Sequence, residues 1–124
     1  MKKEYYKSYY RLERENWWFR VRSKIIRQSI DRLPNESQKL KILNIGVATG
    51  ATSTMLSHFG SVTSSEYDQD TCVFLREELG MEVIQASITD LPFADESFDL
   101  ICAFDVVEHI EDDVMAFREM KRVC

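Results

Sequence analysis

The sequence lacks the features of secreted, zinc-binding and membrane-spanning proteins. Its three cysteines, Cys72, Cys102 and Cys124, lie far apart with no Cys-x-x-Cys spacing, so neither a disulfide framework nor a metal site is expected. No apolar stretch approaches the roughly 20 residues that a bilayer-spanning helix needs. Residues 1–10 are charged and rich in tyrosine, unlike a secretory signal. We therefore expect a cytoplasmic protein.

An excess of basic charge is also absent. The chain carries a net charge of −5, with 44% hydrophobic and 30% charged residues among its 124. Because the sequence forms no concentrated basic footprint, nucleic acid is not an expected partner, whereas a small-molecule substrate is compatible with this composition. The length suits a single compact core.

The first third of the chain differs from the rest. In residues 11–33, apolar side chains recur at nearly helical spacing with Arg and Lys between them, which predicts one amphipathic helix. Pro34 is expected to end this helix, and residues 35–39 are interpreted as a polar linker. Residues 1–40 are therefore predicted to form an N-terminal helical lid segment.

From residue 41 onward, short apolar runs alternate with helical stretches of about ten residues. This alternation predicts right-handed βαβ units, and hence an α/β, Rossmann-like parallel sheet with flanking helices over residues 41–124. We expect the first strand to lie centrally, with the second and third on one side and the fourth on the other. A ligand crevice then opens at the carboxyl ends of the first and fourth strands. The expected strands are 41–45, 61–66, 81–86 and 98–104, and the expected helices are 51–59, 70–79 and 111–123.

The strand-to-helix turn at residues 43–50, with the sequence LNIGVATG, is the first candidate site. Gly46 and Gly50 allow the backbone to approach a ligand closely and to adopt a positive φ. Free N–H groups at the start of the following helix can receive ligand oxygen atoms. A tight turn without a ligand is the alternative.

Glu66 is the second candidate, at the end of the second strand and 20 residues beyond Gly46. A carboxylate there can accept hydrogen bonds from both ribose hydroxyls of an adenosine-containing ligand. The alternative is a solvated charge at a strand end, and Asp68 takes the ribose role if the register differs.

Two later segments complete the candidate crevice. Ser87 and Ile88 follow the third strand, where one polar and one apolar side chain suit the edge and the face of adenine, although a generic loop fits as well. Asp105, Glu108 and His109 follow the fourth strand, where any of them could act as a general base. Helix capping and packing are the alternative for Glu108 and His109.

Together these segments resemble the successive motifs of class I S-adenosylmethionine-dependent methyltransferases. The resemblance covers roughly residues 41–124, and four motifs occur in order: 43–50, Glu66, 91–93 with 97–99, and 105–109 followed by 118–123. Upstream, residues 15–22 (ENWWFRVR) are similar to the N-terminal helix of a bacterial subgroup associated with the methylation of surface polysaccharides or small metabolites.

The resemblance implies S-adenosyl-L-methionine as the cofactor and a small-molecule or saccharide-type methyl acceptor. It implies that residues 46–50 and 104–105 pass the methionine moiety, that Glu66 holds the ribose, and that residues 87–88 flank adenine. It also implies that Trp17, Trp18 and Arg22 form a lid, with Arg22 facing the cofactor carboxylate, unless the tryptophans only anchor their helix. Asp105 and His109 are the candidate catalytic bases. The candidate cofactor-binding residues are Asn44, Gly46, Val47, Ala48, Gly50, Glu66, Tyr67, Ser87, Ile88, Phe104, Asp105, Trp18 and Arg22.

The chain departs from the family pattern at three of these positions. Asn44 replaces the usual acidic residue of the first motif, Ala48 replaces its middle glycine, and Ser87 stands where an Asp often reads the adenine amino group. The family also continues beyond Val123 into further strands. We therefore expect the domain to be truncated after its fourth strand, as a fragment or with a second copy covering that apolar edge.

Two other functions stay open. The chain could be a catalytically incomplete cofactor-binding fragment that dimerises through its fourth strand. It could also be an NAD(P)-binding oxidoreductase, because residues 43–50 and Glu66 suit any adenosine ligand. The oxidoreductase is less favoured, since Ala48 interrupts the Gly-x-Gly-x-x-Gly turn that nicotinamide dinucleotides require.

Overall fold

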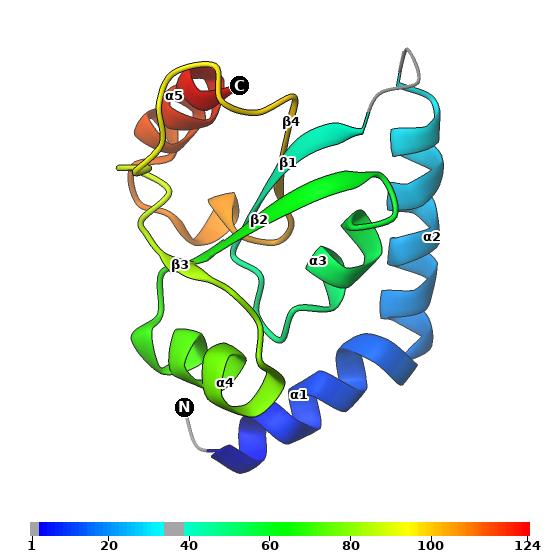
Figure 1. Ribbon diagram of the computed structural model, residues 1–124. Coiled ribbons are helices and arrows are strands. Elements are labelled where there is room, and N and C mark those ends of the chain that lie inside the picture. Colours follow the sequence, from blue (N-terminus) through cyan, green and yellow to red (C-terminus); the bar gives the residue numbers. More distant parts are fainter. Residues whose placement is uncertain (1–2, 34–38) are drawn as a thin grey trace.

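A computed structural model describes residues 3–33 and 39–124 and confirms an α/β protein with N-terminal helices (Figure 1). The predicted helix end at Pro34 and most of the predicted linker, residues 35–38, lie outside the described residues. In chain order the elements are α1 (Lys3–Glu15), α2 (Trp17–Asp31), β1 (Leu40–Ile45), α3 (Ala51–Leu56), β2 (Gly60–Glu66), α4 (Gln69–Leu79), β3 (Ile84–Gln85), β4 (Leu100–Ala103), a 3-10 turn (Val107–His109) and α5 (Asp113–Val123).

The sheet is parallel with the strand order β3-β2-β1-β4, so the prediction of a central first strand is confirmed. Ile45, the last residue of β1, pairs with Ser65 on one side and with Ala103 on the other. The three strands therefore end together, at the point where the chain reverses its winding direction. β4 lies at the edge, as expected; a second copy that covers this edge stays a prediction.

Alternate residues of β1 pack into two separate hydrophobic cores, one on each face of the sheet. Ile42 packs with Met55 and Leu56 of α3 and with Ile30 of α2, whereas Leu43 packs against α5. Accordingly, α2 and α3 lie on one side of the sheet and α5 on the other (Figure 1). The central strand is thus buried on both faces, which matches its short continuous apolar run.

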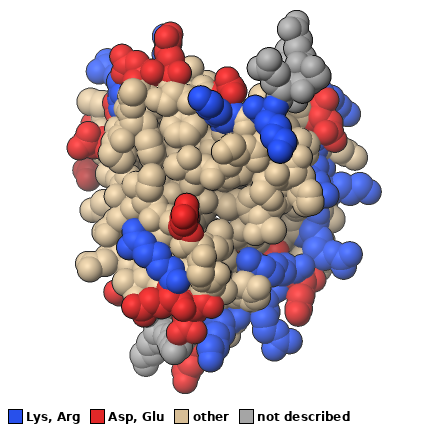
Figure 2. All heavy atoms as spheres, in the orientation of Figure 1, with Lys and Arg blue, Asp and Glu red and all other residues tan. Residues whose placement is uncertain are grey.

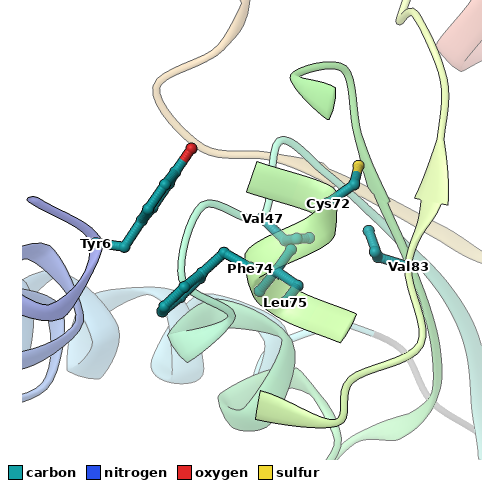
Figure 3. Packing of buried hydrophobic residues seen from close by; sticks show 6 residues of the cluster. All are labelled: Tyr6, Val47, Cys72, Phe74, Leu75 and Val83. Atoms are coloured by element: carbon teal, nitrogen blue, oxygen red, sulfur yellow. The ribbon is translucent and has the colours of Figure 1, made fainter. Parts of the chain in front are cut away.

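A third cluster joins the N-terminal helix to the Rossmann-like part (Figure 3). The ring of Tyr6 in α1 stacks on Phe74 of α4, with 4.7 Å between the ring centroids. The Tyr6 hydroxyl lies 3.3 Å from the hydroxyl of Thr71 and donates to Asp68 at 3.4 Å. Burial raises the pKa of Tyr6, so the hydroxyl keeps its proton at neutral pH. α1 is therefore fixed at the end of the sheet where β1 and β2 terminate (Figure 1).

The prediction of one helix over residues 11–33 is wrong. Helix α1 ends at Glu15, and Asn16 adopts an extended conformation with ψ 137°. Its side-chain oxygen accepts a hydrogen bond from the Trp18 N–H at 2.9 Å, which caps the start of α2. Apolar spacing continues across the break, so periodicity alone could not reveal two helices.

The third and fourth strands are shorter than predicted. β3 begins at Ile84, directly after Val83, whose carbonyl accepts a hydrogen bond from the Arg76 guanidinium at 2.7 Å. Asp99 precedes β4 and holds the start of β1, since its carboxylate accepts the Lys41 N–H at 2.8 Å. The predicted helices 51–59 and 111–123 are likewise trimmed to α3 and α5.

Arg122 near the end of α5 anchors the loop that precedes β4. Its guanidinium donates to the carbonyls of Leu91 at 2.9 Å and Phe93 at 2.7 Å and pairs with the carboxylate of Glu119. Glu119 also accepts the Leu91 N–H at 2.8 Å. The hydrogen bond from Arg122 is the main cause that lowers the pKa of Glu119 below 4.5.

We expect this carboxylate to make stability pH-dependent. Because its pKa is lower in the folded state, its contribution is present above about pH 4.5 and is lost as pH falls through the folded-state value. Glu119→Gln should therefore be less stable than wild type at pH 7, with a gap that narrows in acid. Urea denaturation between pH 3 and 7 tests this. The exposed Glu77→Gln serves as control, and a pH-independent gap for Glu119→Gln contradicts the assignment.

Two glycines allow the cost of left-handed backbone strain to be measured separately from the cost of steric crowding. Gly46 and Gly80 both have positive φ, at 71° and 61°. A Cβ on Gly46 would lie 2.4 Å from Cγ2 of Val106, whereas one on Gly80 meets nothing within 4 Å. Gly80→Ala should cost about 1 kcal/mol from left-handed strain. Gly46→Ala should lose roughly 1–3 kcal/mol more from overpacking against the stiff valine. Equal losses for the two variants in urea denaturation would rule out the crowding.

Candidate functional site

A cavity of about 270 Å³ opens at the carboxyl ends of β1, β2 and β4, where the sequence predicts the crevice. It is lined by the β1–α3 loop, the end of β2, the segment after β4 and both N-terminal helices. The lining residues are Tyr9, Glu13, Arg22, Gly46, Val47, Ala48, Thr52, Glu66, Phe104, Asp105, Val106, His109 and Ile110.

The β1–α3 loop is folded tightly by three left-handed residues. Gly46, Ala48 and Gly50 have φ values of 71°, 48° and 85°. The turn closes with a hydrogen bond from the Gly50 N–H to the Val47 carbonyl at 2.8 Å. Ala48 is strained there because left-handed backbone brings its Cβ close to a carbonyl oxygen. This strain lies in the cavity wall.

The carboxylate of Glu66 is held by backbone N–H groups. One oxygen accepts from Ala48 at 3.2 Å, and the other accepts from Tyr67 at 2.8 Å and from Asp68 at 3.1 Å. These bonds fix the carboxylate beside the β1–α3 loop. A carboxylate has about four lone-pair sites, so one acceptor site remains for a ligand hydroxyl, on the oxygen that faces Ala48.

Asp105 links the end of β4 to α2. Its φ of 56° is the second left-handed non-glycine conformation in the cavity wall. Its carboxylate forms an ion pair with Arg22, and the Arg22 guanidinium lies 4.9 Å from the centroid of the Phe19 ring. The arginine is thus held in the cavity wall, with most of its side chain buried.

Helix α1 is hydrogen-bonded to the β1–α3 loop at Thr49. The carboxylate of Glu13 accepts the Thr49 N–H at 3.1 Å and also the Thr49 hydroxyl. Arg14 donates to the Thr49 carbonyl at 3.1 Å. Glu13 is only 7% exposed and lines the cavity. The N-terminal helix α1 therefore contributes a carboxylate to the wall of the cavity.

Tyr9 adds a hydroxyl to the same wall. Burial, aided by the nearby charge of Glu13, raises the pKa of Tyr9. The phenol is therefore neutral at physiological pH and can donate a hydrogen bond. Sequence reasoning missed Tyr9 and Glu13, because nothing in their local pattern says which face of α1 meets the loop.

Sequence reasoning placed eight residues in the site that do line the cavity, and six that do not. Those in the lining are Arg22, Gly46, Val47, Ala48, Glu66, Phe104, Asp105 and His109. Those outside it are Trp18, Asn44, Gly50, Tyr67, Ser87 and Ile88.

The residues outside the lining have other local surroundings. Asn44 is fully buried and donates its amide hydrogens to the hydroxyls of Thr52 at 2.9 Å and Ser53 at 3.0 Å, which ties β1 to α3. Ile88 packs in the α5 core. Tyr67 is largely exposed, and Ser87 is hydrogen-bonded within its own turn.

His109 lies in the 3-10 turn after β4, with its imidazole largely exposed and 3.7 Å from the Glu108 carboxylate. It lines the cavity together with the β1–α3 loop. In residues 3–33 and 39–124, no group of three or more His, Cys, Asp or Glu side chains could hold a metal ion. None of the helices described there is long and apolar enough to cross a membrane.

Comparisons of the sequence find methyltransferases. Over 114 residues the chain is 31% identical to a Mycobacterium tuberculosis protein named "Probable S-adenosylmethionine-dependent methyltransferase", covering 90% of this chain and 40% of that protein. Over 91 residues it is 31% identical to phosphatidylethanolamine N-methyltransferase of Cereibacter sphaeroides, covering 68% of this chain and 45% of that enzyme. The chain thus spans less than half the length of these curated relatives.

The fold and a family profile agree with these relatives. A crystal structure of a Pyrococcus horikoshii protein superposes with a TM-score of 0.75 at 23% identity, covering 99% of this chain and 61% of that chain. The profile of a family described as "Methyltransferase domain" matches residues 43–124. That match spans the β1–α3 loop, Glu66 and the segment after β4. The chain therefore belongs to the family of class I S-adenosylmethionine-dependent methyltransferase domains.

Proposed function

We propose that this chain is the cofactor-binding part of a methyltransferase that acts on a small-molecule or saccharide-type acceptor. One observation carries the proposal: a single cavity is bounded by the β1–α3 loop, Glu66 and the Phe104–Asp105 segment. Helices α1 and α2 serve as the lid segment, because both contribute side chains to that cavity. The free thiols of Cys72, Cys102 and Cys124 suit a reducing cytoplasm.

Glu66 is the proposed ribose ligand. Its carboxylate is held against the β1–α3 loop by three N–H groups, and a pre-positioned acceptor binds ligand hydroxyls with little reorganisation. The loop itself passes the methionine part of the cofactor, with the backbone of Gly46 and Ala48 in the wall.

Arg22 and Glu13 suit the amino-acid end of S-adenosylmethionine. Arg22 has five N–H donors, so it can hold Asp105 and still donate to a cofactor carboxylate. Glu13 lines the same cavity with a buried carboxylate, which complements the cofactor ammonium group. We propose that Glu13 supplies the negative charge that Asn44 does not, since Asn44 is neutral and turned toward α3.

Bound S-adenosylmethionine would supply the methyl group, by in-line displacement at its sulfonium methyl carbon. The residues of this chain chiefly align the reactants and exclude water, which can account for much of the rate. For an acceptor that must lose a proton, His109 is the proposed base, because its imidazole lines the cavity and can accept a proton. Asp105 is the second candidate, although its carboxylate is already paired with Arg22.

The ribose role predicts that Glu66→Gln weakens every ligand that carries the ribose. Binding of S-adenosylhomocysteine and of 5′-methylthioadenosine should each fall by roughly 10- to 100-fold, the loss of one hydrogen bond to a charged group. Isothermal titration calorimetry measures both, with Glu77→Gln as control. Tighter binding of NAD than of S-adenosylhomocysteine by the wild-type chain would overturn the proposed function.

If Arg22 binds the cofactor carboxylate, replacing it should lower the affinity only for ligands that carry this carboxylate. 5′-Methylthioadenosine keeps adenine and ribose but lacks the amino-acid carboxylate. Arg22→Gln should therefore weaken S-adenosylhomocysteine by about tenfold or more and leave 5′-methylthioadenosine within about twofold. Arg20→Gln, an exposed neighbour on α2 that is absent from the cavity lining, should change neither. Equal losses for the two ligands would mean that Arg22 acts only by holding the fold.

A further inference from the structure

Helix α2 has a second apolar face that the core does not use. Ile26 and Ile30 pack into the cluster with α3 and β1. Trp17, Val21 and Ile25 recur every four residues on another side of the helix and are 71%, 46% and 57% exposed. Trp18 adjoins them at 55% exposure, with its ring edge-on to Trp17. Large apolar side chains gathered on one exposed face mark an interaction surface.

The same helix is basic in an acidic chain. Residues 17–31 contain Arg20, Arg22, Lys24 and Arg27 against a single acid, Asp31, which gives α2 a charge of +3, whereas the whole chain carries −5. Lys and Arg gather along the right-hand side of the molecule, where α2 runs (Figure 2). The net charge of the sequence conceals this asymmetry.

Three of these basic residues line a groove of about 400 Å³ between α2, α1 and α3. Arg20, Lys24 and Arg27 share it with the imidazole of His58. Among the described residues, none of the three basic side chains is in an ion pair. Arg14 and Glu13 also line the groove and carry opposite charges. With four basic side chains against one carboxylate, the groove has an excess of positive charge beside the apolar face.

We propose that this side of α2 docks on an anionic lipid surface. We call it the α2 docking face; it consists of Trp17, Trp18, Arg20, Val21, Lys24, Ile25 and Arg27. A helix with an apolar stripe that includes tryptophan, flanked by Lys and Arg, lies in the plane of a bilayer interface. The apolar side chains enter the boundary between headgroups and acyl chains, and the basic side chains pair with lipid phosphates.

Charge decides between a membrane and a second copy of the chain. A symmetric dimer through this face would place the same patch against itself, so that one +3 helix would meet another. A lipid surface rich in phosphatidylglycerol carries the complementary negative charge, and each Lys or Arg near such a surface strengthens binding by about fivefold. The docking face is independent of the proposed catalytic function.

The experiment uses vesicles of phosphatidylcholine with one third phosphatidylglycerol, and vesicles of phosphatidylcholine alone. The chain has only two tryptophans, Trp17 and Trp18, so its tryptophan emission reports directly on the docking face. We expect cosedimentation with the anionic vesicles, a blue shift of the emission, and weakening of both by salt. Binding to the neutral vesicles should be at least tenfold weaker.

Variants assign the binding to α2. Trp17→Ser with Ile25→Gln should reduce the vesicle affinity at least tenfold. Arg20→Gln, Lys24→Gln and Arg27→Gln together should reduce it about a hundredfold on anionic vesicles. All five side chains are exposed, so circular dichroism should show an unchanged fold. Phe117→Gln and Arg118→Gln on α5, with Phe117 58% exposed, are matched controls that should bind as wild type.

Three results would overturn the proposal: equal affinity for neutral and anionic vesicles, no change in tryptophan emission on binding, or equal losses for the α2 and α5 variants. A blue shift that grows with protein concentration in the absence of lipid, together with dimer mass by light scattering, would assign the face to self-association instead. Binding of single-stranded nucleic acid in preference to anionic vesicles would assign the groove to that partner.

Discussion

The register of β1 with its two neighbours determines where every part of the site lies. Ile45 is level with Ser65 and Ala103, so the residues that follow the three strands emerge at one edge of the sheet. The β1–α3 loop, Glu66 and Asp105 meet for this reason, although 59 residues separate Gly46 from Asp105 in the sequence. A slip of one residue in either pairing would turn alternate side chains to the opposite face and would separate these groups.

Those parts of the site that depend on local pattern could be predicted from the sequence. The turn at residues 43–50 and the spacing to Glu66 follow from strand and helix periodicity, and strand order follows from the handedness of βαβ crossovers. The position of Glu13 could not be predicted, because it depends on how Tyr6 packs against Phe74 in a distant helix. The break at Asn16 was missed for a related reason: a capping side chain carries no signal in hydrophobic spacing.

Some predicted site residues illustrate the competition between core and ligand. Asn44 and Ile88 are close in sequence to residues that line the cavity, yet their side chains stabilise the fold. Asn44 joins β1 to α3 by hydrogen bonds, and Ile88 packs in the core against α5. The cavity wall instead contains two strained residues, Ala48 and Asp105. Left-handed backbone at non-glycine residues persists where surrounding contacts over-determine it, and here both positions are fixed by bonds to Glu66 and Arg22.

The break at Asn16 divides the N-terminal segment into two helices with different directions. Helix α1 reaches Thr49 through Glu13 and Arg14, and α2 reaches Asp105 through Arg22. Glu13 and Arg22 are nine residues apart, so in one unbroken helix, which turns about 100° per residue, they would point to opposite sides. The extended backbone at Asn16 ends that relation, and both side chains line the same cavity. A break in the helix thus allows two neighbouring segments of the chain to contribute opposite charges to one site.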